Sequence, residues 1–311
     1  VLGAAIGGFA SAVFLIYIYL RSSKSRKAEI AQSKHIKVES TGTILKRLLY
    51  VAIPISIGAC VMPLVNMVDS VIVVRRLTET GFNIEQANSL LGQLSGMAIS
   101  TVNLLLVIDQ AIGMSLVPSI SEAYALKQMK RVRKEAKTGL KTILLVTLPA
   151  TFGFAALSGP IMKLLYPAEP ATLGTMLFVV SPCAVFLGLI YAQNGILQGM
   201  GKPMMPVIAL AIGMVFKVVI SYVLTGIPSI NIIGSGIGTL SAYAVASIIE
   251  FMYIKKHLKL RLSPKEFVIK PLITVITMYV VVKLSYGFIV GFLGNSLSTL
   301  VSIAIGGVVY G

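Results

Sequence analysis

Long runs of apolar residues recur from one end of the chain to the other, and they restrict what the chain can fold into. Runs such as PLITVITMYVVV, at 271–282, contain no charged residue and do not alternate between polar and apolar positions. A helix needs about 20 apolar residues to cross a membrane, whereas a membrane β-barrel needs short segments of alternating polarity. The sequence therefore predicts an all-α, polytopic membrane helix bundle.

The composition agrees with a chain embedded in a membrane. Hydrophobic residues make up 56 % of the sequence, charged residues 12 %, and the mean hydropathy is +0.89, whereas soluble domains are about one quarter charged. Because the chain begins and ends inside apolar runs, we expect it to be a piece of a longer protein, with about nine transmembrane helices. These segments are roughly 1–20, 48–74, 90–118, 142–165, 173–198, 206–226, 232–254, 271–292 and 297–311.

The basic residues are confined to alternate loops. A net charge of +16 would suggest a nucleic-acid partner in a soluble protein. Here, 22 of the 27 Lys and Arg residues lie in every second loop, at 21–47, 127–141, 202 and 255–270, and the other loops contain none. Cytoplasmic loops of membrane proteins carry such an excess. We therefore predict that the basic loops face the cytoplasm and that the protein binds no nucleic acid.

Nothing in the sequence indicates enzymatic chemistry. His35 and His257 lie in the basic loops, and Cys60 and Cys183 lie in apolar segments with no other Cys or His at ligand spacing. The turn GMGKP lacks the spacing of a phosphate-binding Walker loop. The sequence therefore predicts no metal centre, no cofactor and no catalytic residue.

Two ionisable residues lie near the middle of apolar segments. They are Asp109, in NLLLVIDQAIG, and Lys217, in GMVFKVVISYVL. An ionisable residue at that depth costs at least about 2.5 kcal/mol on insertion scales, so it usually faces a cavity or a partner. We expect both residues to contact substrate, with pairing inside the protein as the alternative for each.

The segment 48–74 ends in VNMVDSVIVVRRL, which carries three charges. If the helix leaves the cytoplasmic interface near Leu48, Asp69 lies about 31 Å along it, near the outer edge of a hydrocarbon core roughly 30 Å thick. Arg75 and Arg76 then lie about 40 Å along the helix from Leu48. Asp69 lies near Arg76, on the same face of the helix and two turns away. Anchoring to the outer lipid headgroups is one explanation of the arginines. We also expect a substrate role, in an external gate or in phosphate contact, because no other basic residue occupies the outer loops.

Several polar residues are weaker candidates for substrate binding. Asn103, Gln110 and Asn194 are amides, and amides in membrane helices more often bridge helices than bind substrate. Glu122 follows SLVPSIS at the predicted cytoplasmic end, where it suits a salt bridge that closes a gate. The small-residue run GSGIGTLSAYAVAS, at 234–247, predicts close helix packing.

Three stretches resemble a known family. AIPISIGACVMPLVNMVDSVIVVRRL, SLVPSISEAYA, and the block from NGILQGMGKPMMPVIALAIGMVFKVVISYVL to IGSGIGTL are similar to stage V sporulation protein B-type polysaccharide biosynthesis membrane proteins. That group belongs to the superfamily of multidrug, oligosaccharidyl-lipid and polysaccharide exporters and is related to the lipid II flippases. The resemblance covers nearly the whole chain, and the block at 194–240 is its most specific part.

The resemblance implies a MATE-like fold of two six-helix lobes around a central cavity, often with two extra helices. On this chain it implies the last helix of the amino-terminal lobe at 1–20, a cytoplasmic basic linker at 21–47, a six-helix carboxy-terminal lobe at 48–254, and two additional helices at 271–311, the last truncated. One departure concerns the helix that reads LGQLSGMAIS near its start: lipid II flippases carry a basic residue there, and this chain has none.

The resemblance also implies a function. It points to a flippase or exporter that moves a lipid-linked oligosaccharide, or a peptidoglycan or polysaccharide precursor, across the cytoplasmic membrane by alternating access. The partners would be a polyprenyl pyrophosphate-linked sugar, membrane lipids and a coupling ion. A cation-coupled multidrug exporter of the same fold is the alternative. Asp69 and Asp109 favour it, whereas Lys217 and the paired arginines, Arg75 and Arg76, disfavour it. A membrane glycosyltransferase or polymerase fits less well, because the outer loops are short and poor in Asp and Glu.

Overall fold

The computed structural model describes residues 13–18, 21, 40–169, 172–260 and 262–311. All regular structure in these ranges is helical. The chain divides into two compact units, residues 1–50 and 51–311. The predicted span at 1–20 and most of the predicted linker at 21–47 lie outside the described residues. The second unit contains all the candidate site residues.

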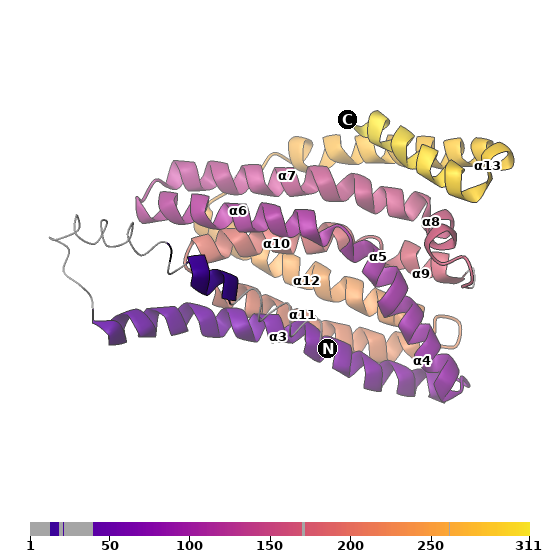
Figure 1. The fold of residues 1–311 in the computed structure, drawn as a ribbon, viewed down its shortest axis with the longest axis horizontal. Coiled ribbons are helices and arrows are strands. Elements are labelled where there is room, and N and C mark those ends of the chain that lie inside the picture. Colours follow the sequence, from indigo (N-terminus) through magenta and orange to yellow (C-terminus); the bar gives the residue numbers. More distant parts are fainter. Residues whose placement is uncertain (1–12, 19–20, 22–39, 170–171, 261) are drawn as a thin grey trace. The chain divides into compact units, whose positions relative to one another are not determined.

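The second unit is built from long apolar helices joined by short turns (Figure 1). The elements are α3 (Thr41–Glu79), which begins in the first unit, α4 (Ile84–Gly92), the π-helix η1 (Gln93–Ile99), α5 (Ser100–Asn103), α6 (Leu106–Ala125), α7 (Met129–Ala156), α8 (Ser158–Leu165), α9 (Thr172–Val180), α10 (Cys183–Gly199), α11 (Met204–Thr225), α12 (Ile233–Leu258), the π-helix η2 (Lys265–Ile269) and α13 (Lys270–Tyr310).

Fewer spans are found than the sequence predicts. Among the described residues, five helices are long and apolar enough to cross a membrane, or six if the bent pair from α4 to α6 counts as one span. The prediction of about nine also counted 1–20 and 48–74, and it divided 271–311 in two. Within α13 the helix is kinked at Gly294, whose φ of 69° lies in the left-handed region that glycine adopts without strain.

The segment predicted at 90–118 is interrupted in the structure. The chain there passes from α4 through η1 and α5 into α6, with a bend of 52° at the break. Three hydroxyl groups donate hydrogen bonds to backbone carbonyls in this stretch: Ser95 to Leu91 (2.6 Å), Ser100 to Ser95 (3.2 Å) and Thr101 to Met97 (2.8 Å). Such bonds compete with the helical ladder and bend helices.

Two other predicted segments are also interrupted. The segment 142–165 is divided between α7 and α8 at Leu157, and 173–198 is divided between α9 and α10. Pro182 precedes α10, so its missing N–H group falls where no helical hydrogen bond is needed. These interruptions lie at the end of the bundle opposite the turn between α6 and α7 (Figure 1).

Glycines allow the central helices to touch through their backbones. α6, α7 and α10 lie side by side (Figure 1), and a β-carbon added to Gly195 of α10 would lie 2.2 Å from the carbonyl oxygen of Gly113 of α6. Between α11 and α12, a β-carbon on Gly213 would lie 2.5 Å from the carbonyl oxygen of Ala242, and one on Gly238 would lie 2.1 Å from Oγ of Ser221. The close packing predicted for the small-residue run at 234–247 is thus confirmed.

Candidate functional site

A buried ion pair joins α3 to α11. Lys217 is 4 % exposed, and its Nζ atom lies 2.5 Å from Oδ2 of Asp69. Most other residues of α11 are apolar, so the helix carries one ammonium group into the bundle. Two charges removed from water must compensate each other, because each alone would cost several kcal/mol. The partner of Asp69 is therefore Lys217, on another helix, although Arg76 lies two turns along the same face of α3.

The ion pair forms one wall of a polar cavity. The cavity has a volume of about 410 Å³ and is lined by residues of α3, α4, η1, α5, α11 and α12. Its polar lining includes Asn66, Asp69, Ser70, Ser95, Ser100, Asn103, Lys217, Thr239 and Tyr243. Three predicted site residues, Asp69, Asn103 and Lys217, thus meet at one cavity.

A π-helix forms part of the cavity wall. Ser95, Gly96 and Ile99 of η1 line the cavity, and Ser100 follows directly. π-helical turns are rare and often occur at functional sites, because the extra residue per turn redirects neighbouring side chains. The hydroxyls of Ser95 and Ser100 bond to backbone carbonyls. Their lone pairs still offer acceptors to a ligand.

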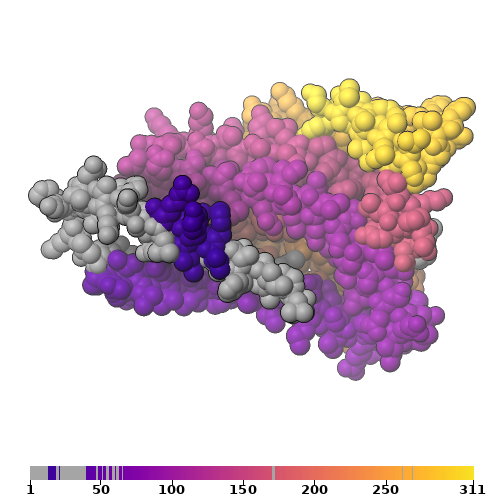
Figure 2. All heavy atoms as spheres, viewed as in Figure 1, coloured from indigo at the N-terminus to yellow at the C-terminus, as the bar shows by residue number. Residues whose placement is uncertain are grey.

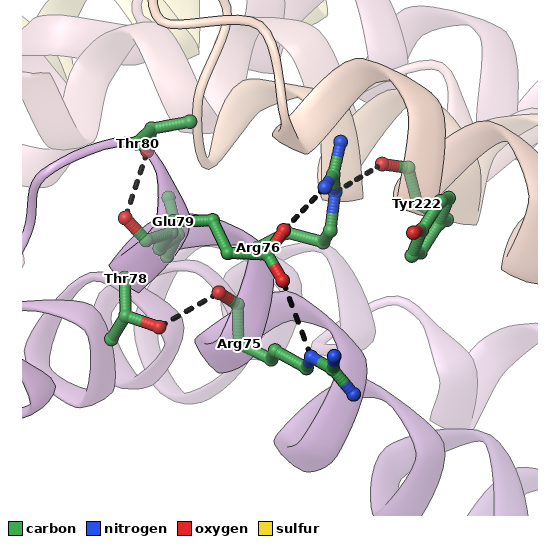
Figure 3. Close-up of polar contacts among 7 residues, drawn as sticks. Arg75, Arg76, Thr78, Glu79, Thr80 and Tyr222 are labelled. Atoms are coloured by element: carbon green, nitrogen blue, oxygen red, sulfur yellow. Dashed lines mark hydrogen bonds and ion pairs between the residues drawn. The ribbon is translucent and has the colours of Figure 1, made fainter.

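Arg75 and Arg76 lie at the end of α3 and do not line this cavity (Figure 3). Arg76 donates from Nε to the carbonyl oxygen of Tyr222 (3.0 Å), stacks 4.4 Å above the Tyr222 ring, and donates from Nη1 to Glu79. A β-carbon added to Gly226 would lie 1.9 Å from its Nη2. The guanidinium is therefore packed against α11 and the residue that follows it, and it fastens the end of α3 to that helix.

Arg75 differs from its neighbour. Its side chain is 78 % exposed, and it donates from Nε to Glu79 (3.2 Å). The hydrogen bond from Arg76, supported by that from Arg75, lowers the pKa of the Glu79 carboxyl below its usual value. Within the described residues, Arg75 makes no contact that ties it to another helix, so the two arginines have different roles in the fold.

Asp109 lies away from the cavity, in the first turn of α6. It is 1 % exposed, and neither carboxylate oxygen has a hydrogen-bond partner among the described residues. A β-carbon on Gly188 of α10 would lie 3.4 Å from Cγ of Asp109 and 2.4 Å from Cγ2 of Thr147 of α7. Three helices therefore meet tightly around an unpaired carboxyl group.

The remaining predicted residues are scattered. Gln110 donates from Nε2 to the hydroxyl of Tyr191 (3.3 Å), which bridges α6 to α10. The Oδ1 atom of Asn194 is buried without a partner in the described part of the chain. Glu122 accepts two hydrogen bonds from Arg131, at 3.0 and 3.1 Å, between the end of α6 and the start of α7. None of the three lines the cavity with Lys217.

Two further residues of interest, Tyr243 and Glu250, are not predicted from the sequence. Tyr243 lines the cavity, and nothing in its run of small residues distinguishes it. Glu250 is fully buried, with both carboxylate oxygens unpartnered within the described ranges. Its position in the apolar stretch ASIIEFMYI was a usable signal. No group of three His, Cys, Asp or Glu residues in the described chain could hold a metal ion.

Curated proteins similar to this chain include membrane transporters. The lipid II flippase MurJ of Bacillus subtilis is 27 % identical over 82 % of this chain and 47 % of its own length. Stage V sporulation protein B of the same organism is 23 % identical over 86 % of this chain and 50 % of its own length. The chain spans about half the length of these relatives.

A solved structure and a family model agree on the fold. An outward-facing multidrug resistance MATE family transporter of the MOP superfamily aligns with a TM-score of 0.57, at 16 % identity, over 88 % of this chain and 67 % of that transporter. The MatE family model matches residues 93–223, from the start of η1 into the end of α11. The expected all-helical, MATE-like fold is confirmed. The chain is therefore a multi-pass membrane protein with a MATE-like fold, and its residues 93–223 match the MatE family model.

Proposed function

We propose that this chain is the carboxy-terminal part of a flippase that moves a lipid-linked sugar precursor from the cytoplasmic to the outer leaflet of the cell membrane. The similarity to the lipid II flippase MurJ supports this substrate class. The two lobes would alternate between inward and outward access. The protein carries out no bond chemistry in this proposal, and its substrate is a polyprenyl pyrophosphate-linked sugar.

One observation carries the proposal: a buried lysine lines a polar cavity. Among the described residues that line the cavity, Lys217 is the only one with an ammonium group. Pyrophosphate needs such a cation, because charge-assisted hydrogen bonds to phosphate are about twice as strong as neutral ones. Asn66, Ser70, Asn103 and Thr239 add amide and hydroxyl groups suited to sugar or phosphate oxygens.

The ion pair suggests how the cavity handles its ligand. Asp69 contacts the ammonium group of Lys217, and in this proposal a phosphate oxygen of the substrate would take its place. An arriving phosphate therefore competes with Asp69 for the same ammonium group. The pair keeps Lys217 compensated in the empty cavity and releases it to a ligand, which weakens binding enough for the substrate to leave.

A second candidate, a cation-coupled multidrug exporter, is supported by Asp109. Its unpartnered, buried carboxyl group is the kind of residue that binds a proton or ion in a membrane transporter. The solved structure with a similar fold, a multidrug resistance MATE family transporter, also supports this candidate. Asp109 lies outside the cavity, and so the flippase remains the better-supported function.

Transport by reconstituted full-length protein tests the proposal. Vesicles carrying a labelled polyprenyl pyrophosphate-linked sugar in one leaflet would report its arrival in the other. We expect Lys217→Gln to reduce the rate at least about tenfold, since it removes a charged contact of about 1.5–3 kcal/mol. Lys283→Gln is the matched control, because Lys283 is exposed and does not line the cavity.

Two results would decide against the flippase. Unchanged lipid transport in the Lys217→Gln protein, folded and inserted normally, would remove Lys217 from the substrate path. Export of an organic cation driven by a proton or sodium gradient, and abolished by Asp109→Asn, would establish the exporter instead.

A further inference from the structure

A second polar cavity lies at the end of the bundle formed by α8, α9 and the kink in α13. It has a volume of about 560 Å³, and its lining includes Lys163, Tyr166, Glu169, Tyr286 and Asn295. Figure 2 shows the atoms of α8 and α13 against each other at the right-hand end of the molecule. None of these residues lines the cavity that contains Lys217.

Hydrogen bonds hold the walls of this cavity in place. The hydroxyl of Tyr286 donates to Oδ1 of Asn295 (2.8 Å), and Nδ2 of Asn295 donates to the carbonyl oxygen of Pro160 (3.2 Å). Asn295 follows the kink at Gly294. The second half of α13 is therefore tied both to the first half and to α8, so the cavity is a defined feature of the fold.

The cavity lining contains two opposite charges that do not neutralise each other. Lys163 is exposed and forms no ion pair with any described residue. Glu169 is partly buried, and its Oε2 atom accepts a hydrogen bond from Nε2 of Gln93 (3.0 Å) without pairing with a described cation. A ligand that complements this cavity carries a negative and a positive group at separate positions.

The position of the cavity indicates where that ligand comes from. The cavity lies where helices turn, at the end of the bundle whose loops lack basic residues and which we predict to face outward. Tyrosines such as Tyr166 and Tyr286 are typical of the membrane interface. Nearby, Phe288 and Phe292 of α13 are 76 % and 90 % exposed, which suits contact with lipid chains.

We propose that Lys163, Tyr166, Glu169, Tyr286 and Asn295 form an outer lipid site for the headgroup of a zwitterionic aminophospholipid such as phosphatidylethanolamine. Lys163 binds the phosphate, and Glu169 accepts hydrogen bonds from the ammonium group. The acyl chains extend along the apolar surface of α13. The site is separate from the cavity that contains Lys217. A lipid bound there would join α13 to α8.

A simpler explanation accounts for Lys163 alone. It lies in the last turn of α8, where the helix dipole stabilises a positive charge. That explanation requires neither Glu169 nor a particular lipid. It predicts a small stability loss in Lys163→Gln that is the same in every lipid, whereas the outer lipid site predicts a change in lipid selectivity.

Lipid retention by the purified full chain tests the site. The protein would be equilibrated with vesicles of phosphatidylethanolamine, phosphatidylcholine or phosphatidylglycerol, and its bound lipid measured by native mass spectrometry. We expect the wild-type protein to retain phosphatidylethanolamine in preference to both others. The trimethylammonium group of phosphatidylcholine has no N–H, and the glycerol of phosphatidylglycerol is neutral, so neither can donate a charged hydrogen bond to Glu169.

Two substitutions remove one charge each. Glu169→Gln keeps an oxygen that accepts from Gln93, so it removes the charge without removing that contact. We expect it to abolish the preference over phosphatidylglycerol. Lys163→Gln should lower retention at least about tenfold, Lys163→Arg should preserve it, and Lys283→Gln should leave it unchanged. Equal retention of the three lipids by the wild-type protein, or an unaltered preference in Glu169→Gln, would overturn the proposal.

Discussion

The Nζ atom of Lys217 lies 2.5 Å from Oδ2 of Asp69, and these residues are 148 positions apart in the sequence. The contact fastens α3 to α11, and both side chains are largely buried, at 5 % and 15 % exposure. In a buried pair each charge depends on the other, because either alone would be left without solvent. The pair is therefore both a packing contact and the most polar part of the cavity.

Breaking this pair on one side should destabilise the protein. We expect Lys217→Met to lower the free energy of unfolding by about 3–5 kcal/mol, since it leaves Asp69 buried and uncompensated. Thermal unfolding in detergent would measure the loss. The double variant Asp69→Leu with Lys217→Met should recover most of it, because no charge remains buried. A double variant as unstable as the single one would show that the pair is not the cause.

Arg75 and Arg76 provide an internally controlled comparison. Arg76→Gln should lower stability by about 1–3 kcal/mol, because it removes the charged hydrogen bond to the Tyr222 carbonyl and the ring contact. Arg75→Gln should have little effect, because Arg75 is exposed and pairs only within α3. Equal losses in both variants would contradict the assignment of a helix-fastening role to Arg76.

The same arginines were predicted to contact substrate, and transport measurements address that prediction. If they bind pyrophosphate, replacing both with Gln should slow translocation, and replacing both with Lys should restore it only partly, since Lys lacks the planar fork that meets two phosphate oxygens. Headgroup anchoring requires charge alone, so Lys would then be as effective as Arg. Full transport by the double Gln protein would remove both residues from the substrate path.

Acid should weaken the contacts at the end of α3. The pKa of Glu79 is lowered from 4.5, chiefly by the hydrogen bond from Arg76, so the contribution of Glu79 to stability is complete above that value and is lost as pH falls through the lower pKa of the folded state. We expect the unfolding temperatures of the wild-type and Glu79→Gln proteins to differ at pH 7 and to converge as the pH falls below the lowered pKa of Glu79. A constant difference would exclude this linkage.

Two glycines in neighbouring helices should respond oppositely to alanine. Gly195→Ala places a methyl group 2.2 Å from the Gly113 carbonyl oxygen, so it must separate α6 from α10 and destabilise the fold. Gly153 lies inside α7 with nothing within 4 Å of its added β-carbon. Gly153→Ala should therefore stabilise by up to about 1 kcal/mol through helix propensity. Chemical denaturation of both variants would test the contrast.

The predicted orientation can be tested by labelling. In a variant without Cys60 and Cys183, a single cysteine at Gln128 should resist an impermeant thiol reagent applied to intact cells, and one at Thr80 should react. The two positions lie in loops that the distribution of Lys and Arg assigns to opposite sides. The reverse labelling pattern would invert the topology.

Features with a strong local signal were predictable from the sequence. Apolar segments and breaks reflect residues within a few positions of each other, and they identified an all-α membrane fold. The division at Gly294 and the close packing of 234–247 follow from glycine and small-residue patterns. The π-helix was not predictable, because it depends on how η1 packs against α9 and on hydroxyl bonds within an otherwise apolar run.

The candidate site was only half predictable. The depth of Lys217 followed from its place in an apolar segment, but its partner depended on which helix lies beside α11. The sequence places Asp69 and Arg76 on one face of α3, but their partners lie on α11: Asp69 contacts Lys217, and Arg76 contacts Tyr222. Local spacing does not determine contacts between helices far apart in the chain.

The separation of Asp69 and Lys217 along the chain also has a consequence during synthesis. At about 5–20 residues per second, Asp69 is made roughly 7–30 s before Lys217. During that interval the carboxyl group must stay protonated or remain in contact with water, because no ammonium group is yet present in α11. The contact between α3 and α11 thus forms only after Lys217 has been made, and a chain that stalls before α11 leaves Asp69 without its partner.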